Sequence, residues 1–405
     1  MKKTITVSKS MGLVIACSTL IVLELAILFS SYGQPGSLSD ATLGRYASQV
    51  VDACAKERYT PSCYDKEIPK LMDKISMEQA FQVASVVQTR DSSYGYCHVL
   101  GHELSAKEAA KDPARWKDVI RRCPQGLCSN GCLHGAAQER FRGETLNDSQ
   151  LAVAEKELVG VCDKTGSWVP TGLEASECFH GLGHLTMYIT GASLTKSLSI
   201  CDTIAIAATG QSYNTLCYEG AFMQLFQPLD EEDKVLVEGK APVTKEQLSP
   251  FCKQFGPDSR VEACWREGLT LYRPGIDTAT GTVQYCSNPI VKNRGHCYNM
   301  LYYANAQGAN YDPVKLSAYC NAMPTFLQPD CFGNIANAII HGGNRLIDQA
   351  VAFCTYGASQ EVLTGCYRTI VDFADYNLLP GSKSFDTLCR ALPAPYGNQC
   401  FKKGR

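Results

Sequence analysis

Five of the seven histidines in this 405-residue chain lie in three short and similar motifs. Two pairs of them are four residues apart, so on a helix each pair would project from one face and could hold one metal ion. Neutral imidazole is a common ligand of zinc, copper and haem iron. The sequence therefore predicts a site for a transition metal (zinc or copper) or haem, made by His98, His102, His134, His180 and His184.

Several neighbours of these histidines could support such a site. Glu103, Gln138 and Glu139 could orient the imidazoles, add oxygen ligands or serve as a base. A base beside a metal-bound water would make the protein a metal-dependent hydrolase, which is the third hypothesis for its function. Glycines in the same motifs permit either close helix approach or a flat ligand such as haem; they are Gly101, Gly135, Gly181 and Gly183. The metalloprotease motif His-Glu-x-x-His is absent, as is the Cys-x-x-Cys-His motif of covalent haem attachment.

The elements that would position the histidines are revealed by the cysteines. Two series of cysteines recur every 34 or 35 residues; they are Cys297, Cys331, Cys366 and Cys400, and Cys286, Cys320, Cys354 and Cys389. Within one period, apolar residues at helical spacing are followed by a Gly-rich turn and a second apolar segment. This pattern predicts an all-α fold, a disulfide-stapled α-solenoid of about eight helical hairpins.

Twenty cysteines remain if Cys17, in the apolar N-terminal segment, is set aside. They could bridge within a hairpin or across the linker between hairpins, and the linker scheme is preferred because the hairpin scheme leaves Cys400 unpaired. Zinc binding by the crowded Cys123, Cys128 and Cys132 is the alternative for three of them. The predicted pairs are Cys54–Cys63, Cys97–Cys128, Cys123–Cys132, Cys162–Cys178, Cys201–Cys217, Cys252–Cys264, Cys286–Cys297, Cys320–Cys331, Cys354–Cys366 and Cys389–Cys400.

The N-terminus indicates where the protein is located. Residues 1–10 carry three lysines and precede an apolar segment at 11–32, which is long enough for a transmembrane anchor with a cytoplasmic tail. A cleaved signal peptide and a lipoprotein box ending at Cys17 are the alternatives. A linker at 33–40, an N-terminal helical cap at 41–95 and a repeat ectodomain at 96–405 would follow, outside the cytoplasm.

Composition narrows the range of partners. The 38 basic and 40 acidic side chains nearly cancel, so the chain has no global positive field and nucleic acid is not an expected partner. Twenty-one cysteines are typical of an oxidising compartment, either periplasmic or extracellular.

The histidines could instead be structural, in a scaffold that binds a protein or peptide on its concave face through Tyr298, Tyr302 and Tyr303. Against this, the histidines occur only in the first three units. The later units carry other residues at the position of His134 and His180, namely Glu219, Arg266, Asn299, Gly333 and Arg368. A structural consensus should persist along the array, so the confinement favours a local site. His296 and His341 fall outside the pattern and are interpreted as ordinary residues.

The motifs Cys97-His98-x-x-Gly101-His102 and Cys178-x-His180-Gly181-x-Gly183-His184 resemble an uncharacterised family of exported, cysteine-rich helical repeat proteins of prokaryotes. This resemblance covers about residues 96–226 and implies the fold and export, without an activity. The repeat length is also similar to that of Sel1-like and tetratricopeptide repeats, which bind proteins, although their signature residues are absent.

Overall fold

A computed structural model describes residues 38–404 except 143, 167, 229–230 and 243. The described residues form helices joined by turns and contain no β-strand; their only β-type pairing is two isolated bridges. The predicted all-α fold is therefore confirmed. Three helices open the described chain, where the helical cap is expected: α2 (Asp40–Cys54), α3 (Thr60–Lys70) and α4 (Met77–Arg90).

Helical units that recur with the period of the cysteines follow. Their first helices are α5 (His98–Ala109), α7 (Cys132–Arg140), α9 (Gly172–Ile189), α11 (Asn214–Phe226), α14 (Asp258–Glu267), α16 (Arg294–Gly308), α18 (Gln328–Gly342) and α20 (Gln360–Asp372). The following helices are α6 (Trp116–Arg121), α8 (Asp148–Leu158), α10 (Leu194–Ile204), α12 (Glu231–Val237), α13 (Lys245–Cys252), α15 (Ala279–Cys286), α17 (Pro313–Asn321), α19 (Ile347–Phe353), α21 (Ala374–Asn377), α22 (Lys383–Ala391) and α23 (Tyr396–Lys403).

Local sequence explains where helix α9 begins. The Thr171 hydroxyl accepts a hydrogen bond from the Glu174 backbone N–H, and the Glu174 carboxylate accepts one from the Thr171 N–H, which forms a capping box. Helix α9 therefore starts six residues before Cys178 and extends through both His180 and His184. This long helix crosses the region where the histidine motifs meet.

The structure contains ten disulfides, and they are the ten pairs of the linker scheme. Nine of them join two cysteines that are 9 to 16 residues apart, each across the connection between two helices. The exception is Cys97–Cys128, which spans 31 residues. Cys123, Cys128 and Cys132 are all in disulfides, so they are not thiolate ligands of zinc. The bridges indicate an oxidising compartment outside the cytoplasm.

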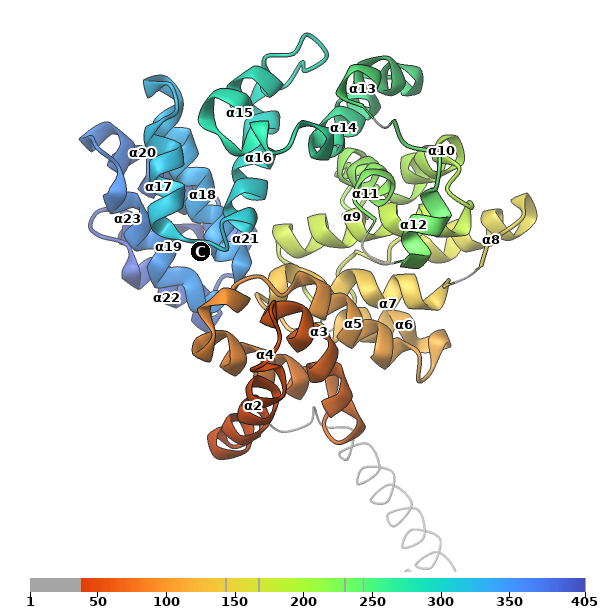
Figure 1. The fold of residues 1–405 in the computed structure, drawn as a ribbon, viewed down its shortest axis with the longest axis horizontal. Helices are drawn as coiled ribbons and strands as arrows, with labels where there is room; N and C mark the ends of the chain where they lie inside the picture. Colours follow the sequence, from red (N-terminus) through yellow and green to blue (C-terminus); the bar gives the residue numbers. More distant parts are fainter. Residues whose placement is uncertain (1–37, 143, 167, 229–230, 243, 405) are drawn as a thin grey trace, which may run out of the picture.

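The array of helices closes on itself. Figure 1 shows the chain running round the molecule from the N-terminal helices through the middle units to the C-terminal units, which return to the start. Hydrogen bonds join the two ends: Asn310 Nδ2 donates to the Ser92 carbonyl (2.7 Å), and the Asn344 backbone N–H donates to the Gly126 carbonyl (3.0 Å). Arg345 also donates to Gln88 Oε1 (3.1 Å) and to the Gly95 carbonyl (3.2 Å).

The tyrosines predicted to line a peptide-binding face lie against other aromatic rings. Of the three tyrosines predicted to contact a peptide, Tyr302 is fully buried and Tyr298 stacks on it. Tyr303 packs near the His341 ring, with ring centroids 5.3 Å apart. These rings are thus at least partly engaged in packing within the C-terminal units.

The expected transmembrane segment, residues 11–32, lies outside the described residues. Among the residues that the structure describes, no helix has the length and apolar character needed to span a bilayer.

Candidate metal centre

Helices α5, α7 and α9 carry the five clustered histidines, and they pack against one another in that order, with α11 packed against α9. Glycines allow the close contacts. A Cβ atom on Gly101 would lie 2.8 Å from the backbone nitrogen of Cys132, and one on Gly183 would lie 2.1 Å from the Cys217 carbonyl oxygen. A Cβ on Gly181 would lie 2.6 Å from His134 Cδ2. The glycines in these motifs therefore serve close helix approach and the placement of one imidazole ring.

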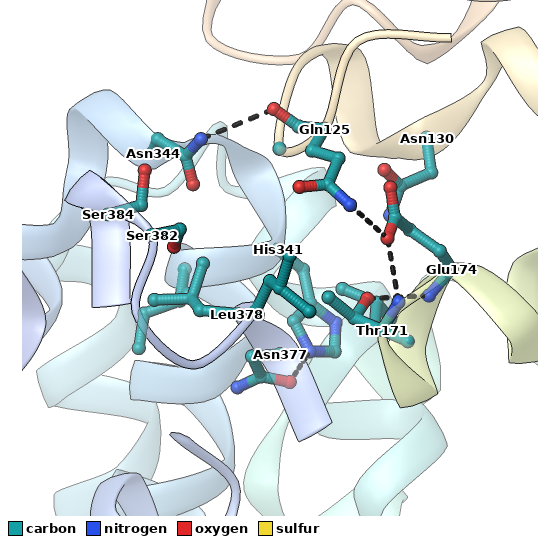
Figure 2. A pocket seen from close by; sticks show the side chains of 14 residues that line it. Gln125, Asn130, Thr171, Glu174, His341, Asn344, Asn377, Leu378, Ser382 and Ser384 are labelled. Atoms are coloured by element: carbon teal, nitrogen blue, oxygen red, sulfur yellow. Dashed lines mark hydrogen bonds between the residues drawn. The ribbon is translucent and has the colours of Figure 1, made fainter. Parts of the chain in front are cut away.

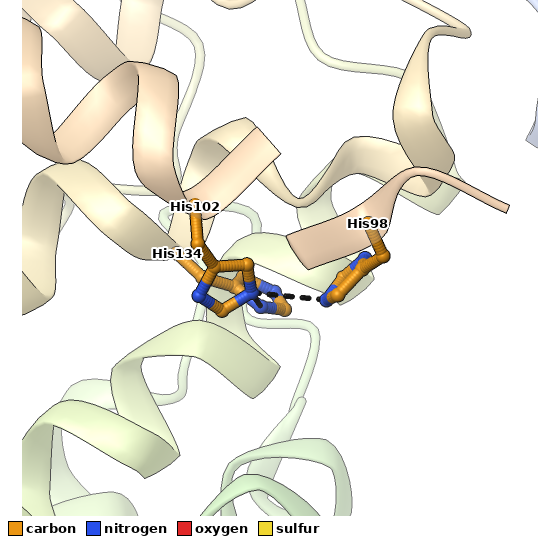
Figure 3. Close-up of side chains that lie close together, drawn as sticks. All are labelled: His98, His102 and His134. Carbon is orange, nitrogen blue, oxygen red and sulfur yellow. Dashed lines mark hydrogen bonds between the residues drawn. The ribbon is translucent and has the colours of Figure 1, made fainter. Parts of the chain in front are cut away.

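Three of the histidines form a compact cluster, His98, His102 and His134, with ligand atoms that all lie within 4.8 Å of one another (Figure 3). The Nε2 atom of His102 is central: it lies 3.0 Å from His98 Nε2 and 3.2 Å from His134 Nδ1. His102 and His134 are buried, at 7% and 1% exposed.

The hydrogen-bond partners of the outer nitrogens determine where the protons lie. His98 Nδ1 is 3.0 Å from the Ser129 carbonyl oxygen, and His134 Nε2 is 2.9 Å from the Glu177 carbonyl oxygen. A carbonyl can only accept, so each of these nitrogens carries the proton of its neutral ring. His102 Nδ1 likewise donates to Gln138 Oε1 at 2.9 Å. Three unprotonated nitrogens, one from each ring, consequently face one another at the centre of the cluster.

A strained turn positions one of these acceptors. Cys128, Ser129 and Asn130 have φ values of 49°, 48° and 57°, in the left-handed region that costs a non-glycine residue about 1–2 kcal/mol. The first residue of this turn, Cys128, forms a disulfide with Cys97, which immediately precedes His98. The disulfide thus holds the strained turn beside His98, where the Ser129 carbonyl accepts the proton of its ring. Strain that the surrounding structure maintains is often found at functional sites.

A second histidine pair lies on α9. His184 Nε2 is 3.1 Å from His180 Nε2, and His184 Nδ1 donates to Gln224 Oε1 on α11 at 2.7 Å. Both rings lie beside His134, with centroids 5.7 Å from its centroid. All five predicted histidines therefore gather in one region, while three of them converge on one point.

Burial keeps the imidazoles neutral. Desolvation lowers the pKa of His98 to about 4. It also lowers the pKa values of His102, His134 and His180 well below the ordinary value, and the neighbouring imidazoles lower the pKa of each ring further. Desolvation also lowers the pKa of His184. Neutral imidazole is the form that binds metal. Burial and the nearby Glu219 have the opposite effect on the Glu177 carboxyl, and raise its pKa to about 7.

The three predicted supporting residues have different surroundings. Gln138 binds His102, as expected for a residue that orients a ligand. The exposed side chain of Glu103 acts electrostatically on Asp65, and Glu139 pairs with Arg142 at 2.9 Å. Gln224 and Glu177 also lie at the site and were not predicted as site residues. Glu177 could have been found from its spacing, because it lies three residues before His180 and seven before His184.

The two remaining histidines lie elsewhere. His341 Nε2 is 2.8 Å from Asn377 Oδ1, and its Nδ1 has no hydrogen-bond partner among the described residues. It lines a small polar cavity of about 60 Å³ at the junction of the first and last units, together with Gln125, Thr171 and Glu174 (Figure 2). His296 Nε2 lies 3.5 Å from Glu219 Oε1. Neither residue is in the cluster formed by His98, His102 and His134.

No known protein-family model matches this sequence, and no curated protein matches it significantly. The functional argument therefore rests on the geometry of the site.

Proposed function

We propose that the protein binds a transition-metal ion through His98 Nε2, His102 Nε2 and His134 Nδ1. The observation that carries the proposal is the convergence of three unprotonated ring nitrogens whose partner nitrogens are held by Ser129, Gln138 and Glu177. Lone pairs that face one another at about 3 Å repel, and a bound cation turns this repulsion into attraction. Protein ligands are commonly fixed by such acceptors on the far nitrogen.

Two of the three separations between the ligand atoms match those around a divalent ion, and all three atoms lie within 4.8 Å of one another. With Zn–N bonds of about 2.0–2.1 Å, two nitrogens on a tetrahedral zinc lie about 3.3 Å apart. The separations of 3.0 and 3.2 Å around His102 are close to that value. Imidazole ligands suit zinc and copper, and three of them leave a coordination position for water or another ligand.

Two other hypotheses receive less support. The space next to the motif glycines is occupied by neighbouring backbone or by the His134 ring, which removes the argument for a flat haem. Glu139 forms an ion pair with Arg142, so the base expected in a hydrolase has another partner. The scaffold hypothesis requires that the histidines bind no metal, and the titration below tests that directly.

We expect metal-free protein to bind zinc tightly at pH 7 when the full chain, purified in detergent, is titrated in a calorimeter. Because burial lowers the pKa of His98 to about 4 and those of His102 and His134 well below the usual value, protons should compete little at pH 6. Affinity should thus change little between pH 8 and 6 and should fall as the pH approaches 4.

An exposed histidine pair would behave differently, and would lose affinity as the pH falls through its unperturbed pKa of about 6.5. If neither zinc nor copper binds at pH 7, the cluster is a hydrogen-bonded core and the scaffold hypothesis replaces this one.

We further propose that residues 11–32 anchor the protein in the membrane, with the repeat units outside the cytoplasm. The basis is the apolar sequence of this segment, the lysines before it and the ten disulfides after it. Protease added to intact cells should digest the helical units and leave a small N-terminal fragment in the membrane. A mature protein that begins near Gln34 would identify a cleaved signal peptide instead.

A further inference from the structure

The second histidine pair, on α9, is built in the same way as the first, on α5. In each pair the two Nε2 atoms are about 3 Å apart, at 3.0 Å for His98 and His102 and 3.1 Å for His180 and His184. The two rings of each pair are inclined at nearly the same angle, 60° and 58°. The two pairs therefore share the spacing and the inclination of their rings.

The same kind of residue orients both pairs. A glutamine on the first helix of the next unit accepts from Nδ1 of the second histidine: Gln138 on α7 binds His102, and Gln224 on α11 binds His184. With Nδ1 protonated, the Nε2 lone pair of His184 faces His180 as that of His102 faces His98. The side chain of Gln224 is buried in the close α9–α11 contact, which holds this arrangement in place.

One ion cannot be bound by all five rings, because His134 lies between the pairs in an orientation that serves only one of them. An imidazole binds metal through a nitrogen lone pair in the plane of its ring. The His134 ring is nearly perpendicular to His98 and His102, at 74° and 88°, and directs Nδ1 toward His102. The His134 ring is inclined by only 26° and 33° to the rings of His180 and His184. Its Nε2–H donates to the backbone carbonyl of Glu177.

Glu177 lies on the same helix as the second pair, so rotation of its side chain could supply the carboxylate of a third ligand. Glu177, His180 and His184 occupy positions i, i+3 and i+7 of α9, so all three lie on one face of the helix. Glu177 Oε2 lies 3.7 Å from His134 Nε2, which places the carboxylate beside the cluster. Two histidines and one glutamate form a known ligand set for zinc.

We infer that His180, His184 and Glu177 bind a second divalent transition-metal ion, beside the ion bound by His98, His102 and His134. This inference rests on the proposed function and extends it to a centre with two ions. The His134 ring and the Glu177 backbone carbonyl separate the two sites and link them through one hydrogen bond.

The test is the number of zinc ions that bind to the full metal-free chain in detergent, measured by calorimetry and by elemental analysis after dialysis. We expect two ions per wild-type chain. The variant His180→Asn/His184→Asn should bind one ion, and Glu177→Gln should keep the first ion and lose or weaken the second. Glu177→Gln leaves the backbone carbonyl that orients His134 in place, so it tests the carboxylate alone.

His341→Asn provides the matched control, because His341 is also a histidine whose pKa burial lowers to about 4, and it should leave two ions bound. Loading the wild-type chain with Cu(II) gives a readout that needs no variant: two ions in adjacent sites should show magnetic coupling in the electron paramagnetic resonance spectrum.

A wild-type chain that binds one ion, unaffected by the His180/His184 substitutions, would overturn the second site and leave the proposed function intact. A chain that binds none would overturn both.

Discussion

Replacing His98 and His102 together by asparagine should abolish zinc binding at the first site. The substitution removes two of three ligands, and bound zinc in small protein sites contributes on the order of 10 kcal/mol. Loss of about half of that free energy corresponds to an affinity reduced on the order of ten-thousandfold. Calorimetric titration with a competing chelator measures the change, and His341→Asn should show no loss.

The same variant should also change the pH dependence of the stability of the metal-free protein. Above pH 6.5 the imidazoles are neutral in both the folded and the unfolded chain. As the pH falls below that value, the histidines of the unfolded chain become protonated. His98 stays neutral in the folded state, because its pKa there is about 4. The free energy of unfolding of the metal-free wild type should therefore fall between pH 6.5 and 4.

The double variant should show a shallower fall, because two of the buried histidines are gone. A variant that still binds zinc with wild-type affinity at the first site, and whose only change is lower stability, would show that the rings are packing groups.

The cysteine period predicted both the hairpins and their bridges because it repeats a geometric relation. Where one hairpin ends and the next begins, the ends of the two helices meet. The two cysteines at each such junction therefore lie side by side, as Cys320 and Cys331 do. Closure of the array had no such signature. It depends on contacts that occur once each, such as those made by Asn310, Asn344 and Arg345.

The residues of the histidine cluster could be predicted from the sequence, but the separation of three converging rings from a second pair could not. Spacing along a helix placed His98 with His102 and His180 with His184, and the packing order of the units brought His134 between them. Which nitrogen of each ring points inward depends on backbone carbonyls, those of Ser129 and Glu177, and every residue has such a group. The left-handed turn that places the Ser129 carbonyl has no glycine to mark it.

Gly220→Ala should destabilise the fold severely, although alanine is favoured over glycine in a helix interior by about 1 kcal/mol. A Cβ atom at position 220 would lie 1.9 Å from the His180 carbonyl oxygen and 3.1 Å from Gly183 Cα. Both are backbone atoms that no rotamer change can move, so α11 must shift away from α9.

Overpacking of this kind costs about 1–3 kcal/mol and more where backbone is displaced, so we expect the free energy of unfolding to fall by about 3 kcal/mol. The shift should also pull Gln224 away from His184 and weaken binding at the second site. The matched control is Gly295→Ala in α16, where the closest atom to a new Cβ is 3.6 Å away, and it should change stability by no more than about 0.5 kcal/mol. Chemical unfolding followed by circular dichroism measures both variants. Equal stability of the two would show that α9 and α11 are not packed as closely as the structure has them.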